Sequence, residues 1–114
     1  MKKLRVGVVG TGYLGKFHAE KYAGMDEVEL VGVVDIEKEK AENTAATLGI
    51  SAYTNYRDLF GKVDAVSIVV PTPVHFAVSK NFLENGIDVL IEKPITTTLE
   101  EADELIKIAE SKGL

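Results

Sequence analysis

The 114-residue sequence contains no cysteine, so disulfide bonds, thiolate metal sites and thiol nucleophiles are excluded. This absence fits a reducing compartment, and we expect the protein to be cytoplasmic. Long apolar runs are also missing, since none approaches the roughly 20 residues that a membrane-spanning helix needs. The apolar run that follows Met1–Arg5 is too short, and too interrupted by glycine, to be a secretory signal.

An excess of positive charge is absent as well. The 13 Lys and Arg residues are outnumbered by 18 Asp and Glu residues, which gives a net charge of −5. Basic residues are scattered and form no stripe, which argues against nucleic acid and anionic membranes as partners. Two histidines without a pattern of neighbouring carboxylates do not predict a metal site. The composition is that of one globular domain over residues 1–114.

The most informative segment is a glycine motif that directly follows an apolar run. Val6–Val9 leads into Gly10–Gly15, which has the pattern G-x-G-x-x-G behind a predicted strand. Gly10 lets the backbone leave the strand in a tight turn, and Gly12 lacks the Cβ that would hold a pyrophosphate away from the main chain. Gly15 lets the following helix lie close to the strand. Without further context, an ordinary strand-to-helix turn would explain the same glycines.

The context comes from an acid at the end of the next apolar run. Val28–Val34 is followed by Asp35, which lies 20 residues after Gly15, the offset of the ribose-binding carboxylate in dinucleotide-binding folds. The helix that opens at Tyr13 and Leu14 offers backbone N–H groups to phosphates. Asp35 could accept hydrogen bonds from both hydroxyls of an adenosine ribose, and its charge would repel a 2′-phosphate. The alternative for Asp35 is a solvated acid at a strand end.

Apolar runs and helical periodicity alternate along the whole chain. Predicted strands cover Val6–Val9, Val28–Val34, Ile50–Tyr53, Ala65–Val70 and Asp88–Ile91; predicted helices cover Tyr13–Tyr22, Glu37–Leu48, Val74–Asn85 and Leu99–Ser111, with a helical turn at Tyr56–Phe60. Right-handed crossovers then give an α/β fold with a doubly wound parallel sheet, a Rossmann fold with strand order 3-2-1-4-5 and helices on both faces.

Ligands of such sheets bind at the carboxyl ends of the strands, beside the switch point between the first and fourth strands. Candidate cofactor-binding residues that follow the fourth and fifth strands are Pro71, Thr72, Pro73, His75, Glu92 and Lys93. Thr72 could contact a ribose, and His75 either points into the crevice or caps its helix. Lys93 could polarise a hydroxyl or carbonyl or shuttle a proton, or it is a surface lysine. For His18, in the first helix, a buried and hydrogen-bonded ring is expected.

Taken together, these motifs resemble the amino-terminal domain of the Gfo/Idh/MocA oxidoreductases. The segments that carry the resemblance are Gly10–Gly15 with His18, Val33–Asp35, Pro71–His75 and, most specifically, Glu92-Lys93-Pro94. The resemblance implies NAD(P)-dependent oxidation of a secondary alcohol on a sugar, nucleotide sugar or polyol, with Lys93 as a catalytic residue. It implies NAD as the cofactor, because no arginine lies beside Asp35, while Lys38 and Lys40 keep NADP open.

The sequence departs from that family by stopping at Leu114. Family members carry a second domain that supplies most substrate contacts, a catalytic histidine and usually the oligomer interface. We therefore expect a truncated piece that binds cofactor without efficient turnover, with an exposed fifth strand and last helix that could drive a non-native dimer. A stand-alone NAD(H)-sensing module and an S-adenosylmethionine-dependent methyltransferase are the alternatives. A purely structural domain leaves the three glycines and Asp35 unexplained.

Overall fold

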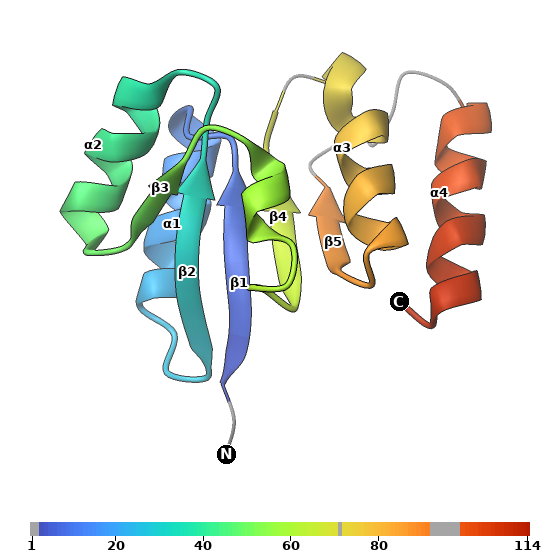
Figure 1. Ribbon diagram of the computed structural model, residues 1–114, viewed down its shortest axis with the longest axis horizontal. Helices are drawn as coiled ribbons and strands as arrows, with labels where there is room; N and C mark the ends of the chain where they lie inside the picture. The colour runs from blue at the N-terminus through green and yellow to red at the C-terminus, as the bar shows by residue number, and fades with distance from the viewer. Residues whose placement is uncertain (1–2, 71, 92–98) are drawn as a thin grey trace.

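The computed structural model describes residues 3–70, 72–91 and 99–114 (Figure 1). Its elements, in chain order, are β1 (Leu4–Val9), α1 (Tyr13–Ala23), β2 (Val28–Val34), α2 (Lys38–Leu48), β3 (Ser51–Tyr53), the 3₁₀ helix η1 (Tyr56–Leu59), β4 (Ala65–Ile68), α3 (Thr72–Glu84), β5 (Asp88–Ile91) and α4 (Leu99–Lys112). The sheet has the order β3-β2-β1-β4-β5, and every neighbouring pair of strands is parallel. The predicted doubly wound topology is therefore confirmed.

Helices cover both faces of the sheet because the strands are apolar on both sides. On one face, Val8 and Val33 pack in a cluster with Ala19 of α1 and Ala45 of α2. On the other face, a second cluster holds Val9, Val34, Val66 and Ile68 against η1 and α3, with Leu59 and Phe82 fully buried. Figure 1 shows α1 behind the sheet and η1 in front of it. These helices and η1 thus pack on the two faces of the sheet.

The connection from β4 to α3 differs from its sequence prediction at both ends. The strand ends at Ile68 and not at Val70, because β1 leaves the sheet at Gly10; the last bond along this ladder runs from the Val69 N–H to the Val9 carbonyl at 2.8 Å. The helix begins at Thr72 and includes Pro73 in its first turn. Proline is tolerated there because the first N–H groups of a helix have no intrahelical acceptor. The connection between strand and helix therefore lies two residues earlier in the chain than predicted, and its length of three residues is unchanged.

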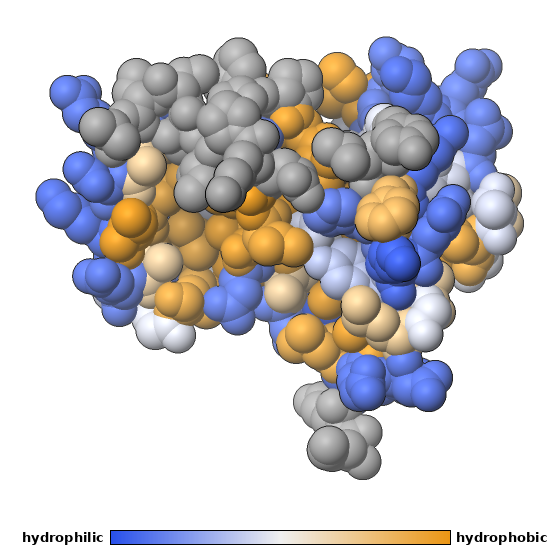
Figure 2. Space-filling view, turned by 180° about the vertical axis from the view of Figure 1, so that it is seen from behind, coloured by the Kyte–Doolittle hydropathy of each residue, from blue (hydrophilic) through white to orange (hydrophobic). Residues whose placement is uncertain are grey.

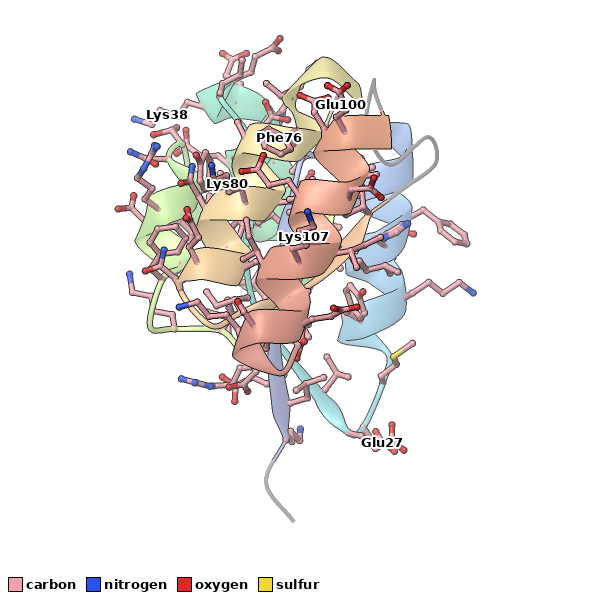
Figure 3. All side chains as sticks on the ribbon, turned by 90° about the vertical axis from the view of Figure 1, so that its right-hand side faces the viewer. Glu27, Lys38, Phe76, Lys80, Glu100 and Lys107 are labelled. Carbon is pink, nitrogen blue, oxygen red and sulfur yellow. The ribbon has the colours of Figure 1, made fainter. Side chains whose placement is uncertain are left out.

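At the other side of the molecule, β5 forms an edge of the sheet and α4 packs beside α3 (Figure 3). Lys80 of α3 pairs with Glu104 of α4, with 3.3 Å between Nζ and Oε1. Leu90 and Ile106 are 55% and 54% exposed. Figure 2 shows apolar residues gathered on this side of the molecule. The apolar surface predicted for the fifth strand and last helix is thus present.

None of the helices in residues 3–70, 72–91 and 99–114 is long and apolar enough to cross a membrane. Within the same residues, no cluster of histidine, aspartate and glutamate side chains is arranged to hold a metal ion.

Candidate functional site

The turn between β1 and α1 can be made only with glycine at two positions. Gly10 has a φ of +105°, and a Cβ built there would lie 2.2 Å from the Val69 carbonyl oxygen. A Cβ built at Gly15 would lie 1.9 Å from the carbonyl oxygen of Gly10. Both contacts are with backbone, which cannot swing aside as a side chain would. These glycines therefore fix how closely α1 approaches the turn.

Gly12 has a different environment from the other two glycines. It is the N-cap of α1, with φ −69° and ψ −169°, and no side chain caps the helix there. A Cβ built at Gly12 would have no heavy atom within 4 Å, apart from its chain neighbours and the helix backbone. The first N–H groups of α1 lack intrahelical acceptors and carry the positive end of the helix dipole. The open space at Gly12 therefore lets an anion approach these donors closely.

Asp35 is held beside this turn by three hydrogen bonds. Its Oδ2 accepts from the backbone N–H of Thr11 at 3.0 Å and from the Thr11 hydroxyl at 2.7 Å. Its Oδ1 accepts from the backbone N–H of Glu37 at 2.9 Å. The strand pairing of β1 and β2 brings the two segments together, with the Gly10 N–H donating to the Val34 carbonyl at 2.7 Å. The predicted pairing of glycine turn and acid is thus formed in space.

The surroundings of Asp35 favour its ionised form. Partial burial raises the pKa of this carboxyl, but the hydrogen bonds from Glu37 and Thr11, together with the charge of Lys40, outweigh it and hold the pKa below its usual value. Stability from this carboxylate is therefore present above the pKa of aspartate in the unfolded chain. It is lost as the pH falls through the lower pKa of the folded state.

A groove of about 480 Å³ runs from the turn along the carboxyl ends of the strands. Its walls are mainly aliphatic and are formed by Val9, Val34, Ile36, Val69, Val70, Val74 and Val78. Asp35, Lys40, Thr54 and Tyr56 add polar groups to the lining. Ile36 directly follows Asp35 and is 90% exposed. The groove can therefore take a flat apolar ring while the Asp35 carboxylate accepts hydrogen bonds from hydroxyl groups.

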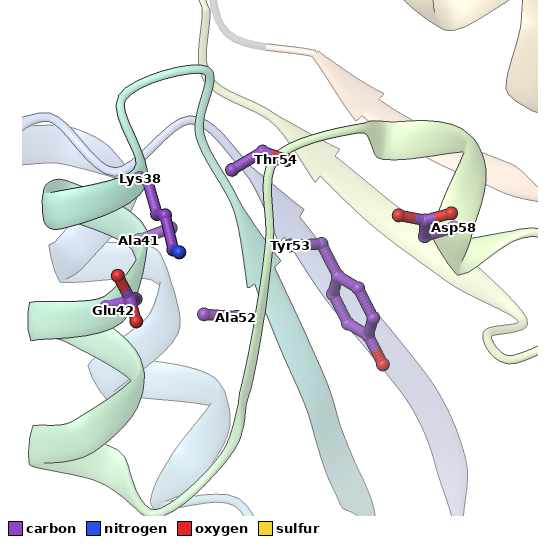
Figure 4. Close-up of a pocket in the computed structure, with 7 residues that line it drawn as sticks. All are labelled: Lys38, Ala41, Glu42, Ala52, Tyr53, Thr54 and Asp58. Atoms are coloured by element: carbon purple, nitrogen blue, oxygen red, sulfur yellow. The ribbon is translucent and has the colours of Figure 1, made fainter.

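Lys38 and Lys40, the two lysines that leave NADP possible as the cofactor, lie in different places. Lys40 lines the groove with Asp35 and pairs with Glu37, with 3.3 Å between Nζ and Oε2. Lys38 lines a separate groove of about 510 Å³ beside β3, together with Glu42 and Asp58 (Figure 4), and the two grooves adjoin at Thr54. Only Lys40 is therefore near the carboxylate expected to contact the ribose.

The two histidines are held by neighbouring groups. His75 is 2% exposed, and its Nε2 lies 2.6 Å from the Val70 carbonyl oxygen, so that this nitrogen donates. The ring thus fixes the segment that carries Val70 to the groove, and His75 is not among the described residues that line it. His18 is only partly buried, contrary to its prediction, and its ring meets the Tyr22 ring edge-on at 6.5 Å. Contact of His75 with a cofactor stays a prediction.

Several predicted site residues lie beyond what the structure describes. Pro71, Glu92 and Lys93 lie outside the described residues. Tyr13, Leu14, Thr72 and Pro73 are placed by their helical backbone at the starts of α1 and α3. Sequence reasoning missed Thr11, Ile36 and Tyr56 as neighbours or lining residues of the site. For Thr11 a signal existed, since a hydroxyl between the two glycines of a turn can donate to a nearby carboxylate.

Comparison with known proteins agrees with this geometry. The family model described as "Oxidoreductase family, NAD-binding Rossmann fold" matches residues 4–114. The chain is similar to UDP-N-acetylglucosamine 3-dehydrogenase of Acidithiobacillus ferrooxidans, with 46% identity over 114 residues, which are 100% of this chain and 36% of that protein. The solved structure of that dehydrogenase matches with a TM-score of 0.94 and covers 100% of this chain and 37% of its own.

Two further relatives also match most of this chain and about a third of their own length. The scyllo-inositol 2-dehydrogenase (NAD(+)) of Bacillus subtilis is 38% identical over 104 residues, 88% of this chain and 30% of that protein. The WlbA dehydrogenase from Bordetella pertussis, solved in complex with NADH and UDP-GlcNAcA, matches with a TM-score of 0.91 at 27% identity, over 98% of this chain and 36% of its own. The chain thus spans about a third of the length of the curated relatives that it matches.

Proposed function

Because this chain belongs to the Gfo/Idh/MocA oxidoreductases, whose NAD-binding Rossmann domain it matches over residues 4–114, we propose that it is the cofactor-binding part of a dehydrogenase. The proposed reaction is hydride transfer between a nicotinamide cofactor and a secondary alcohol of a sugar, nucleotide sugar or polyol. The observation that carries the proposal is the Asp35 carboxylate, held by three hydrogen bonds beside an open glycine turn. Substrate contacts are expected from the part of the relatives that this chain does not cover.

The described residues offer a place for each part of a dinucleotide. The N–H groups at the start of α1, with the open space at Gly12, would hold the pyrophosphate. Asp35 would accept a hydrogen bond from the adenosine ribose, and the aliphatic lining between Ile36 and Val74 would contact the adenine ring. A bound nicotinamide would supply hydride-transfer chemistry at the carbon that carries the substrate hydroxyl. Lys93 would contact that hydroxyl and is the proposed catalytic residue.

We propose NAD rather than NADP as the preferred cofactor. Asp35 is ionised at neutral pH and lies where the 2′-phosphate of NADP would have to approach. The charge of Lys40 is already shared with Glu37 through their ion pair. Lys40, the cation among the described residues that line the groove, is therefore poorly placed to compensate a phosphate beside a carboxylate.

Calorimetric titration of the chain with NADH and with NADPH, at neutral pH, tests this assignment. We expect NADH to bind more tightly than NADPH, and Asp35→Ala to weaken NADH binding by about tenfold or more, since a hydrogen bond to a charged group contributes about 1.5–3 kcal/mol. NADPH affinity should rise relative to NADH in the variant. As the pH falls through the lowered pKa of Asp35, the affinity of the parent chain for NADH should fall with it.

Asp58→Ala is the matched control, because it removes the same charge from an exposed residue of the separate groove beside β3. Its affinity for NADH should equal that of the parent chain. Equal losses in the Asp35 and Asp58 variants would show that net charge, and not the site, governs binding. An NADH affinity that Asp35→Ala leaves unchanged would overturn the assignment of the ribose site.

A further inference from the structure

Thr11 occupies the first variable position of the glycine motif, and its side chain points away from solvent. The residue is only 1% exposed, although it lies in a turn at the rim of the groove. Both of its donors, the backbone N–H at 3.0 Å and the hydroxyl at 2.7 Å, bind the same carboxylate oxygen, Oδ2 of Asp35. A carboxylate oxygen has about two lone-pair sites, so Thr11 alone satisfies Oδ2.

The other carboxylate oxygen is placed differently. Oδ1 of Asp35 accepts the Glu37 N–H at 2.9 Å, and this is one bond where the oxygen can accept two. Asp35 lines the groove, and Thr11 lies in the turn beside it. A ligand hydroxyl that meets Asp35 from the groove therefore finds its best acceptor at Oδ1.

We infer that Thr11 is a positioning residue for cofactor recognition: its hydroxyl holds the Asp35 carboxylate by Oδ2 and so presents Oδ1 to a ribose hydroxyl. This inference rests on the proposed function, and it deepens that function by naming what orients the ribose acceptor. Two bonds from one buried residue remove the rotation about the Cβ–Cγ bond that a surface aspartate would otherwise have. The ligand then meets a carboxylate that is already oriented.

The Thr11 hydroxyl also affects the pKa of Asp35. The described titratable groups that line the groove with Asp35 are Glu37 and Lys40, from the start of α2, and Tyr56 of η1; the lining from β1, β4 and α3 is aliphatic or glycine, apart from Thr11. Valine at position 11 keeps the shape of threonine and all of these groups, but it removes one donor that lowers the pKa of Asp35. Serine keeps that donor.

The test compares Thr11→Val and Thr11→Ser in two measurements. In the ligand-free chain, the Asp35 carboxyl is titrated by ¹³C NMR; Thr11→Val should raise its pKa, and Thr11→Ser should leave it near that of the parent chain. In calorimetry with NADH, Thr11→Val should weaken binding about tenfold, and Thr11→Ser should restore most of the affinity. Thr47→Val is the control, because its hydroxyl donates at 3.0 Å to the Asn43 carbonyl on the exposed face of α2. It should change neither readout.

The two measurements separate this inference from the proposed function. If the parent chain binds NADH and Thr11→Val binds it equally well with an unchanged Asp35 pKa, the inference is overturned while the proposed function stands. If the parent chain does not bind NADH, the proposed function is rejected. The titration of the Asp35 carboxyl then tests by itself whether Thr11 positions that carboxylate. An Asp35 pKa that is the same in the parent chain, Thr11→Val and Thr11→Ser then overturns the positioning role.

Discussion

A Gly12→Ala variant is expected to fold like the parent chain and to lose about 100-fold in affinity for NADH. Its backbone conformation, φ −69° and ψ −169°, suits alanine, and the new Cβ would have no heavy atom of the protein within 4 Å apart from its near neighbours along the chain. That free space is where the pyrophosphate must approach the N–H groups of α1. A methyl group there imposes a steric cost of about 3 kcal/mol on the complex alone, or roughly 100-fold in affinity.

Two measurements separate the effect of Gly12→Ala on folding from its effect on NADH binding. Urea denaturation should give a free energy of unfolding within about 0.5 kcal/mol of the parent value, as for other substitutions that disturb no contact. Calorimetry with NADH should show the loss of affinity. Retained tight binding in a folded Gly12→Ala chain would mean that the pyrophosphate does not lie against this turn.

Gly15→Ala is expected to lower the stability of the folded chain. The added Cβ would lie 1.9 Å from the Gly10 carbonyl oxygen, and Gly10 is itself fixed, with a φ of +105°, against the Val69 carbonyl. Relief requires α1 to move off the turn, which disturbs the packing of Ala19 on the sheet. Overpacking of this kind typically costs about 1–3 kcal/mol, and contact with fixed backbone puts this position at or above the upper end. The melting temperature should fall by about 10 °C or more.

Gly12→Ala is the matched control, since the same methyl group is added three residues earlier in the same turn. Thermal and urea unfolding should separate the two variants clearly, with only Gly15→Ala destabilised. If both variants unfold at the parent temperature, α1 does not lie as close to the turn as the structure places it.

Much of the fold is predictable from the sequence because local and long-range signals agree. Val28–Val34 and Asp88–Ile91 have the predicted strand bounds, since a turn or glycine precedes each run and its interior is β-branched or aliphatic. Right-handed crossovers then allow few orders of strands. The ends of β4 and α3 were less predictable, because they depend on where the neighbouring strand β1 turns away at Gly10.

The close contacts of the glycines inside the strands could not be predicted from the sequence. Gly7 and Gly32 are paired in register across β1 and β2. A Cβ at Gly7 would meet Leu59 at 2.7 Å, and one at Gly32 would meet the Tyr53 ring at 2.7 Å. These close contacts join residues from distant parts of the chain, so periodicity gives no signal for them. The contact of the His75 Nε2 with the Val70 carbonyl oxygen spans only five residues, but periodicity gives no signal for it either, because it depends on how the chain turns between β4 and α3.

The candidate site was predicted in outline and not in its internal contacts. Spacing placed Asp35 beside the glycine turn, because the two lie at the ends of adjacent parallel strands. It could not show that Thr11 donates twice to Asp35, because that depends on one side-chain rotamer. Nor could it separate Lys38 from Lys40, since two positions two apart on a helix point in different directions. The role of Lys93 remains a prediction from the sequence.

The most direct test of the central claim is a ¹⁵N NMR titration of the chain with NADH. The largest shifts of amide signals are expected at Gly10–Gly15 and at Asp35–Glu37, with β5 and α4 unaffected. Lys38, Glu42 and Asp58, which line the separate groove, should respond less than Asp35. Shifts concentrated in that separate groove, or no shifts at NADH concentrations that saturate dinucleotide-binding domains, would show that the glycine turn and Asp35 do not form an NADH site.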